Sequence, residues 1–291
     1  MNKTILLAVL ATLAIAVVAI PNRGLAQDDD SKGIRAEVFL KARPAKKAKS
    51  TARYHAKSST GSAESFANAA QVGITIWRFR KSTATDRTKE LVEEEDGGPT
   101  EWTLERVEEG TLLAPGQRVR LSIESLTRNG YVYVVDREQY ADGSFGEPVL
   151  IFPTQKTNAA NKVGPGRLIY IPSATGRFII KPSASTKPQV AEVLTIIVAP
   201  SSLISNDELA LKAIHLKRET FDSWVKQWEA NSKKFEMDGG AGQAMTPTEQ
   251  LAASTSAALL NQDDPVPQTI FQLAAKPDKP LLITVPLKFV R

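Results

Sequence analysis

The chain has 291 residues, with 37 lysines and arginines, 32 aspartates and glutamates, two histidines and no cysteine. The lack of cysteine excludes disulfides and a lipid-modified N-terminal cysteine, and with only two histidines it argues against a tetrahedral zinc site. A chain of this length can still hold itself together by burying apolar surface.

Residues 1–26 are expected to form a secretory signal peptide. Lys3 precedes an apolar run over 4–20, and Gly24-Leu25-Ala26 fits a cleavage site after Ala26. The alternative is an uncleaved anchor, although this run of 17 residues is shorter than the roughly 20 that span a bilayer. We therefore expect an exported protein that is periplasmic, outer-envelope associated or secreted. It would contact a membrane only through an uncleaved leader.

Residues 27–70 are a basic segment rich in Ala, Lys and Ser. Positions 31–70 hold nine lysines and arginines against two glutamates, whereas 71–291 has a net charge of −1. Because the segment lacks apolar periodicity, we predict a disordered linker. Its charge could attract an anionic polymer of the envelope. The lack of interleaved aromatic residues argues against nucleic-acid binding.

Residues 71–291 are expected to form one mainly β domain. Short runs rich in β-branched residues alternate with turn residues about every 8–12 positions, which is typical of a sandwich or barrel. We predict an antiparallel β-sandwich, Ig-like or jelly-roll-like. The expected strands are 72–80, 89–95, 118–125, 131–138, 148–152, 167–172, 177–182 and 190–199, with a closing hairpin of 267–275 and 280–290.

Within this domain, 118–153 is expected to be a meander of three strands. Apolar residues at 119, 121 and 123 alternate with polar ones, which predicts a strand with one face buried and one in water. The run 131–138 is β-branched or aromatic at nearly every position, which favours a central strand covered on both faces. Asn129–Gly130 and the tip at 142–146 are expected to reverse the chain.

A small helical insertion is expected at about 219–260, near the C-terminus. Its first helix would follow Thr220 as N-cap and end at the glycine-rich residues 239–242. The second would begin at Thr246, where Glu249 completes a capping box. The apolar residues that fall on one face of the first expected helix are Phe221, Trp224, Val225, Trp228 and Phe235.

The run GYVYVVDREQYADGSFGEPVLIFP at 130–153, preceded by G-x-R-V-R-L, carries a family resemblance. It resembles a domain of unknown function from bacterial exported proteins, which also occurs attached to bacterial protein kinases and caspase-like peptidases. The shared pattern is a Gly-Tyr-x-Tyr-Val strand, an Asp-Gly tip and a Leu/Ile-Phe-Pro close, and it covers about 110–200. The family supplies no established catalytic residues, so the resemblance implies a β-rich accessory or binding module.

The candidate binding residues lie on and around the hairpin tip. Its carboxylates could act as acid and base in glycoside cleavage or bind an ion. Its aromatic rings could stack on a sugar or contact a partner. The alternative is that these residues only form the turn and pack. The candidates are Asp136, Arg137, Tyr140, Asp142 and Phe145.

No catalytic residue, metal site or cofactor is expected. His215 has no nucleophile motif to serve, and the S-x-x-K match at Ser223–Lys226 lacks its companion motifs. We expect a non-enzymatic, envelope-associated binding or structural module, whose partner is a protein or an anionic envelope polymer. One alternative is a carbohydrate-active or other hydrolytic enzyme that uses carboxylates near 136–142. Another is a regulatory partner of another exported protein.

Overall fold

The structure is a computed structural model that describes residues 33–46, 50–61, 66, 68–94, 97–157, 160–181, 186–254 and 258–290. The predicted signal peptide over 1–26 lies outside these residues. Within the described ranges, every helix is too short or too polar to cross a bilayer.

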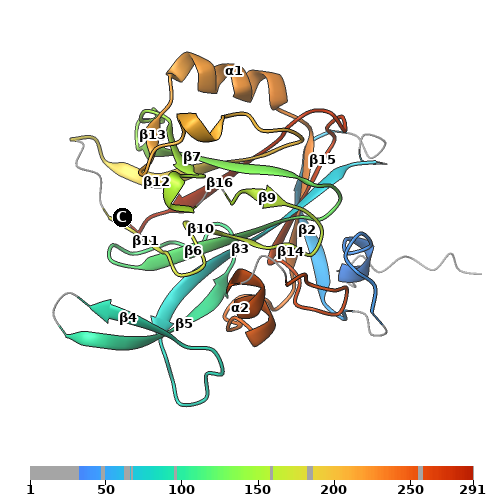
Figure 1. The fold of residues 1–291 in the computed structure, drawn as a ribbon, viewed down its shortest axis with the longest axis vertical. Helices are drawn as coiled ribbons and strands as arrows, with labels where there is room; N and C mark the ends of the chain where they lie inside the picture. The colour runs from blue at the N-terminus through green and yellow to red at the C-terminus, as the bar shows by residue number, and fades with distance from the viewer. Residues whose placement is uncertain are drawn as a thin grey trace, which may run out of the picture. The chain divides into compact units, whose positions relative to one another are not determined.

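Two antiparallel sheets pack into a β-sandwich, which confirms the predicted fold class (Figure 1). The larger sheet runs β1-β2-β14-β15-β3-β5-β4, with β6 on β3 and with β10 and β11 on β6. Its strands are β1 Ile34–Arg35, β2 Arg53–Ser59, β3 Ala70–Lys81, β4 Glu90–Glu94, β5 Gly98–Val107, β6 Arg118–Ser125, β10 Ile169–Ile171, β11 Phe178–Ile179, β14 Ser232–Met237 and β15 Thr269–Leu273. The smaller sheet runs β13-β8-β7-β12-β16, with β9 beside β7. Its strands are β7 Gly130–Tyr140, β8 Val149–Phe152, β9 Lys162–Val163, β12 Gln189–Ala199, β13 Ile214–His215 and β16 Leu281–Lys288.

The main core lies between the two sheets. Strand alternation sends every second side chain inward, so that Ile74 of β3 and Leu121 of β6 meet Val134 of β7 and Ile196 of β12 in one buried cluster. Burial of this aliphatic cluster is the main driving force available to a chain without cross-links. Short 3₁₀ helices lie in the connections, at Ala36–Val38, Gln155–Thr157 and Asn206–Glu208.

Helix α1, Arg218–Trp228, covers the outer face of the smaller sheet (Figure 1). Its buried Phe221 packs against Tyr133 and Val135, which lie on the face of β7 opposite the main core. Strand β7 is therefore covered on both faces, as its composition predicts. Trp224 and Trp228 stack on each other with ring centroids 5.3 Å apart.

The predicted meander is wrong at its first turn. Strand β7 pairs with β8 and β12, whereas β6 pairs with β3, β10 and β11 in the other sheet. Residues 126–129 thus cross between sheets. Gly130 does not take a positive φ, and a Cβ there would lie 2.7 Å from the Ala199 carbonyl oxygen. Close approach of two strands, and not a tight turn, requires this glycine.

Strand β6 is also buried on its polar face, contrary to the expected exposure to water. Arg120 and Glu124 are 1% and 0% exposed. Arg120 forms two hydrogen bonds of 2.7 and 2.8 Å to Glu90, and Glu124 accepts two of 2.8 and 2.5 Å from Arg43. Polarity in the sequence did not reveal that distant segments bring opposite charges to these groups, which lets them be buried.

The predicted linker over 27–70 is wrong for residues 33–46 and 50–61, which are folded. Strand β2 pairs with β14 in the larger sheet. Phe39 and Tyr54 are buried with Phe235, and the ring centroids of Phe39 and Tyr54 lie 5.3 Å apart. The few buried residues of the segment join one cluster with partners that are far away in the sequence, so no local alternation marks them. The remaining residues of 27–70 lie outside the described ranges, apart from 66 and 68–70.

Both expected helices are present, but a strand separates them. α1 ends at Trp228, and α2, Pro247–Ser254, begins at the predicted capping box. Between them, β14 lies inside the larger sheet between β2 and β15. Phe235 therefore belongs to a strand, and its place on the helix face is wrong. The hydrogen bonds of β14 to β2 and to β15 stabilise a strand here, whereas the helical spacing of Phe235 alone contributes little to a helix.

The expected closing hairpin is also wrong. Strand β15 pairs with β14 and β3 in the larger sheet, whereas β16 pairs with β12 in the smaller one. The connection at 274–280 therefore crosses the sandwich. Alternating apolar residues predicted both strands correctly, but they do not specify which neighbour each strand pairs with.

Candidate functional site

Strand β7 places the candidates Asp136 and Arg137 on opposite faces of the smaller sheet. Asp136 follows Val132 and Val134 on the side that faces the other sheet. Arg137 follows Tyr133 and Val135 on the side covered by α1. Side chains of adjacent strand residues point in opposite directions, so the five candidates do not converge on one site.

Arg137 packs between two aromatic rings. Its guanidinium carbon lies 4.4 Å from the Phe145 ring centroid and 4.6 Å from the Phe221 ring centroid. Burial lowers the pKa of Arg137. Such cation–π contacts attach the tip and α1 to the sheet, which favours the packing interpretation for Arg137 and Phe145.

The tip is held by its own polar contacts. Asp142 Oδ1 accepts hydrogen bonds of 2.9 and 2.6 Å from the backbone N–H and hydroxyl of Ser144. These hydrogen bonds, together with one from Lys187, lower the pKa of Asp142 to about 2. The Tyr140 hydroxyl donates to the Glu138 carboxylate. Asp142 and Tyr140 thus behave as turn-forming residues.

Asp136, in contrast, lies beside a second carboxyl group that is not among the candidates. In the antiparallel pair of β7 and β12, Leu194 is opposite Asp136, and Glu192 is opposite Glu138. Glu192 is therefore diagonal to Asp136 on the same face, and the two carboxyl groups lie within hydrogen-bonding reach. Gln189 Nε2 donates to Glu192 Oε1 at 2.8 Å.

One proton shared by the two carboxyl groups accounts for their geometry. Asp136 Oδ1 and Glu192 Oε2 are shielded from solvent, and no donor among the described residues reaches either oxygen. Burial, and then the charge of Glu192, raise the pKa of Asp136 to about 8. Burial also raises the pKa of Glu192. Asp136 thus keeps a proton at neutral pH, and the two carboxyl groups share it.

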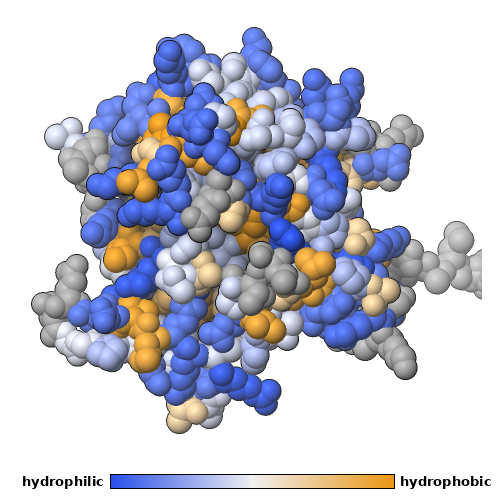
Figure 2. Space-filling model, in the orientation of Figure 1, coloured by the Kyte–Doolittle hydropathy of each residue, from blue (hydrophilic) through white to orange (hydrophobic). Residues whose placement is uncertain are grey.

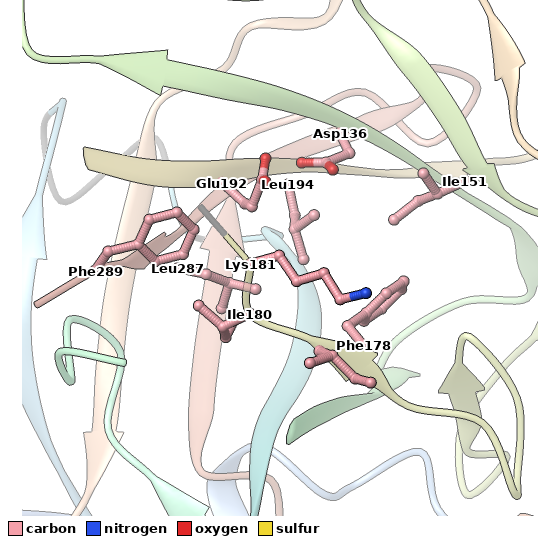
Figure 3. A pocket seen from close by; sticks show the side chains of 10 residues that line it. Asp136, Ile151, Phe178, Ile180, Lys181, Glu192, Leu194, Leu287 and Phe289 are labelled. Atoms are coloured by element: carbon pink, nitrogen blue, oxygen red, sulfur yellow. The ribbon is translucent and has the colours of Figure 1, made fainter. Parts of the chain in front are cut away.

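The two carboxyl groups line a cavity of about 190 Å³ that we name the acid pocket (Figure 3). It lies between β11 of the larger sheet and β7, β12 and β16 of the smaller one. Its walls are Ile151, Phe178, Ile180, Leu194, Leu287 and Phe289. Ile179, which is 43% exposed, and Lys181 also line it. In Figure 3 the carboxyl groups lie on one side, and the Lys181 ammonium points away from them toward Phe178.

One signal in the sequence points to this site, although Glu192 was not a predicted site residue. Glu192 is the sole acid in the apolar strand VAEVLTIIVA. A charged residue within a buried strand needs a partner or a proton. The aromatic residues Phe178 and Phe289 gave no such signal, because apolar wall residues resemble ordinary core residues in the sequence.

The fold and site define a β-sandwich with an acidic, apolar-walled pocket between its sheets. Within the part of the chain that the structure describes, no three His, Cys, Asp or Glu side chains group as metal ligands. Comparisons with protein-family models, curated proteins and solved structures gave no match.

Proposed function

We propose that this chain is a non-enzymatic, exported binding module of the bacterial envelope, and that its ligand occupies the acid pocket. The single observation behind this proposal is the carboxyl pair of Asp136 and Glu192, which lines an apolar cavity and in which one buried oxygen of each group lacks a donor among the described residues. A few polar groups in a mainly apolar concavity are the usual composition of a ligand site. The exposed residues Ile179 and Lys181 give the cavity a route to solvent.

The spacing of the carboxyl groups supports binding over glycoside cleavage. Glycosidases keep their two carboxyl groups about 5–5.5 Å or about 6.5–9.5 Å apart, which leaves room for the sugar or a water molecule. Asp136 and Glu192 instead lie close enough to share one proton. Glu138 already accepts a hydrogen bond from Tyr140, and Asp142 accepts two from Ser144.

The partner-regulation alternative has less support. Tyr140 and Phe145, which could have formed an exposed contact patch, are half-buried and held by neighbouring side chains. On the face shown in Figure 2, hydrophobic residues form small groups separated by hydrophilic ones. Protein-docking sites are usually larger continuous apolar patches.

The proposed envelope location comes from the leader-like residues 1–26 and from the family resemblance. Attachment to an anionic polymer through the basic segment has weaker support, because some of its charges are already paired. Arg43 is buried against Glu124, and Lys46 lies 3.5 Å from Asp263. The pocket is therefore the better candidate for recognition.

The test is native mass spectrometry of the protein purified from an envelope extract. Ile179→Trp should close the pocket mouth, whereas Leu211→Trp, at a residue 61% exposed and outside the pocket lining, serves as the matched control. We expect a small co-purifying molecule on the wild type and on the control, and its loss from Ile179→Trp. Equal retention by all three proteins, or no bound molecule on any of them, would contradict the proposal.

A further inference from the structure

The ligand class can be inferred from what the acid pocket leaves unsatisfied. Once the shared proton has left, Asp136 Oδ1 and Glu192 Oε2 are acceptors that no donor of the described residues reaches. The second oxygen of Glu192 already accepts from Gln189. A ligand that completes this site must therefore bring hydrogen-bond donors and no further acceptor.

The charges around Asp136 and Glu192 favour a cationic ligand. Glu138 on β7 adds a second negative charge that acts on Asp136 and Glu192. The neighbouring strands β8 and β16 contribute the apolar Ile151 and Leu287 to the lining, and Lys181 is the one cation among the described residues that line the pocket. With one proton on the carboxyl pair, the sum over these groups is negative. A carboxylate or phosphate ligand would be repelled at short range in this half-buried site.

The apolar walls and the volume of the acid pocket favour a ligand with a short apolar stem. Apart from the carboxyl pair and Lys181, every lining residue is aliphatic or aromatic. The cavity of about 190 Å³ has room for several water molecules and is comparable to an engineered apolar cavity of about 150 Å³ that binds benzene. Sugar rings would leave their hydroxyl groups facing hydrocarbon, which costs free energy. An alkyl or arylalkyl group would replace this water favourably.

Resting on the proposed function, we propose that the acid pocket binds a primary ammonium group carried on an apolar stem. An ammonium group has three donors and no acceptor, which matches Asp136 Oδ1 and Glu192 Oε2. A lysine side chain of a peptide and a free alkylamine share this chemistry.

Binding of the ammonium group releases the proton that the two carboxyl groups share. The free pocket holds one proton shared by Asp136 and Glu192, and R–NH₃⁺ enters as this proton leaves to solvent. Both carboxylates then face the ammonium, because an adjacent positive charge favours their ionised forms. Below a pH of about 8, where Asp136 carries its proton, the affinity should rise about tenfold for each pH unit. Above that pH it should level off.

The test is isothermal titration calorimetry with n-hexylammonium chloride and, as the neutral probe, 1-hexanol. We expect saturable ammonium binding to the wild type at pH 7, at least about tenfold tighter than hexanol. Asp136→Asn and Glu192→Gln should each weaken it by at least about tenfold, since each removes an ionisable carboxyl group. Asp142→Asn, at the hairpin tip, is the matched control and should bind like the wild type. Nα-acetyl-lysine methylamide distinguishes the sources: equal binding indicates a peptide lysine, and weaker binding indicates a free amine.

Equal affinity for hexanol and hexylammonium, unchanged binding in Glu192→Gln, or no saturable binding would overturn the inference. Unfolding midpoints of all variants identify any that fail to fold, and the hexanol comparison on the wild type does not depend on them. If hexylammonium fails to bind while Ile179→Trp still loses a co-purifying molecule, the ligand class is wrong but the binding function stands. Failure of both experiments would remove both proposals.

Discussion

Replacing Asp136 with Asn should change how the stability of the protein depends on pH. The pKa of Asp136 is raised from 3.8 to about 8 in the folded protein. Between these values the folded state binds more protons than the unfolded state, so the free energy of unfolding falls as the pH rises. The amide of the Asp136→Asn variant would be neutral throughout. The variant should therefore lose less stability than the wild type as the pH rises from about 5 to about 8, where Asp136 loses its proton.

The magnitude follows from the pKa difference. One proton contributes at most about 1.36 kcal/mol for each pH unit, so three pH units give an upper limit of about 4 kcal/mol. The pocket is lined partly by exposed residues, which lets water solvate the ionised carboxylate and reduces the penalty. We expect the stability difference between variant and wild type to change by about 2–3 kcal/mol between pH 5 and pH 8, in favour of the variant.

The assay is urea unfolding followed by tryptophan fluorescence at several pH values, since the chain has four tryptophans. Asp142→Asn is the control. The pKa of Asp142 is lowered from 3.8 to about 2 in the folded protein. Its carboxylate therefore stabilises the fold at pH values above 3.8, and this contribution is lost only as the pH falls from 3.8 to about 2. The difference in unfolding free energy between Asp142→Asn and the wild type should stay constant between pH 5 and pH 8. The same constant offset for Asp136→Asn would refute the buried, shared proton.

Three further changes test the packing of the fold. Arg43→Ala leaves Glu124 buried without its partner and should cost about 3–5 kcal/mol, measured by urea unfolding; a cost below about 1 kcal/mol would mean that the segment around Arg43 is not docked. Thr246→Ala removes the cap of α2 and should cost about 1 kcal/mol, with Thr246→Ser as the conservative control in thermal unfolding. Gly73→Ala places a Cβ 2.2 Å from Pro267 Cγ and should cost about 1–3 kcal/mol; an unchanged midpoint would contradict this contact.

Much of the strand content was predictable, but the pairing was not. The β-branched run at 131–138 and the alternation at 118–125 both form the expected strands. They nevertheless belong to different sheets, since β7 pairs with β12 along its length and Gly130 permits the close approach at one end. Alternation fixes which side chains share a face of a strand. It does not specify which neighbouring strand supplies the hydrogen bonds.

One of the two carboxyl groups of the acid pocket was named from the sequence. Asp136 was a candidate, and its location on the core side of β7 follows from the same alternation as Val132 and Val134. Glu192 was not a candidate, since it comes 56 positions later in the chain and meets Asp136 only through the register of β7 and β12. The other candidates, such as Asp142, matched turn chemistry that the sequence already offered as the alternative.

The sequence by itself determined the local preferences of this protein, which include many of its strands, the capping box of α2 and the Asp-Gly tip. These depend on residues near one another in the chain. The tertiary structure decided which charged groups are exposed and which are buried, as Arg43 with Glu124 and Asp136 with Glu192 show. The reason is that burial of a charged group is tolerable only when a distant segment supplies its counter-charge or when a proton neutralises it.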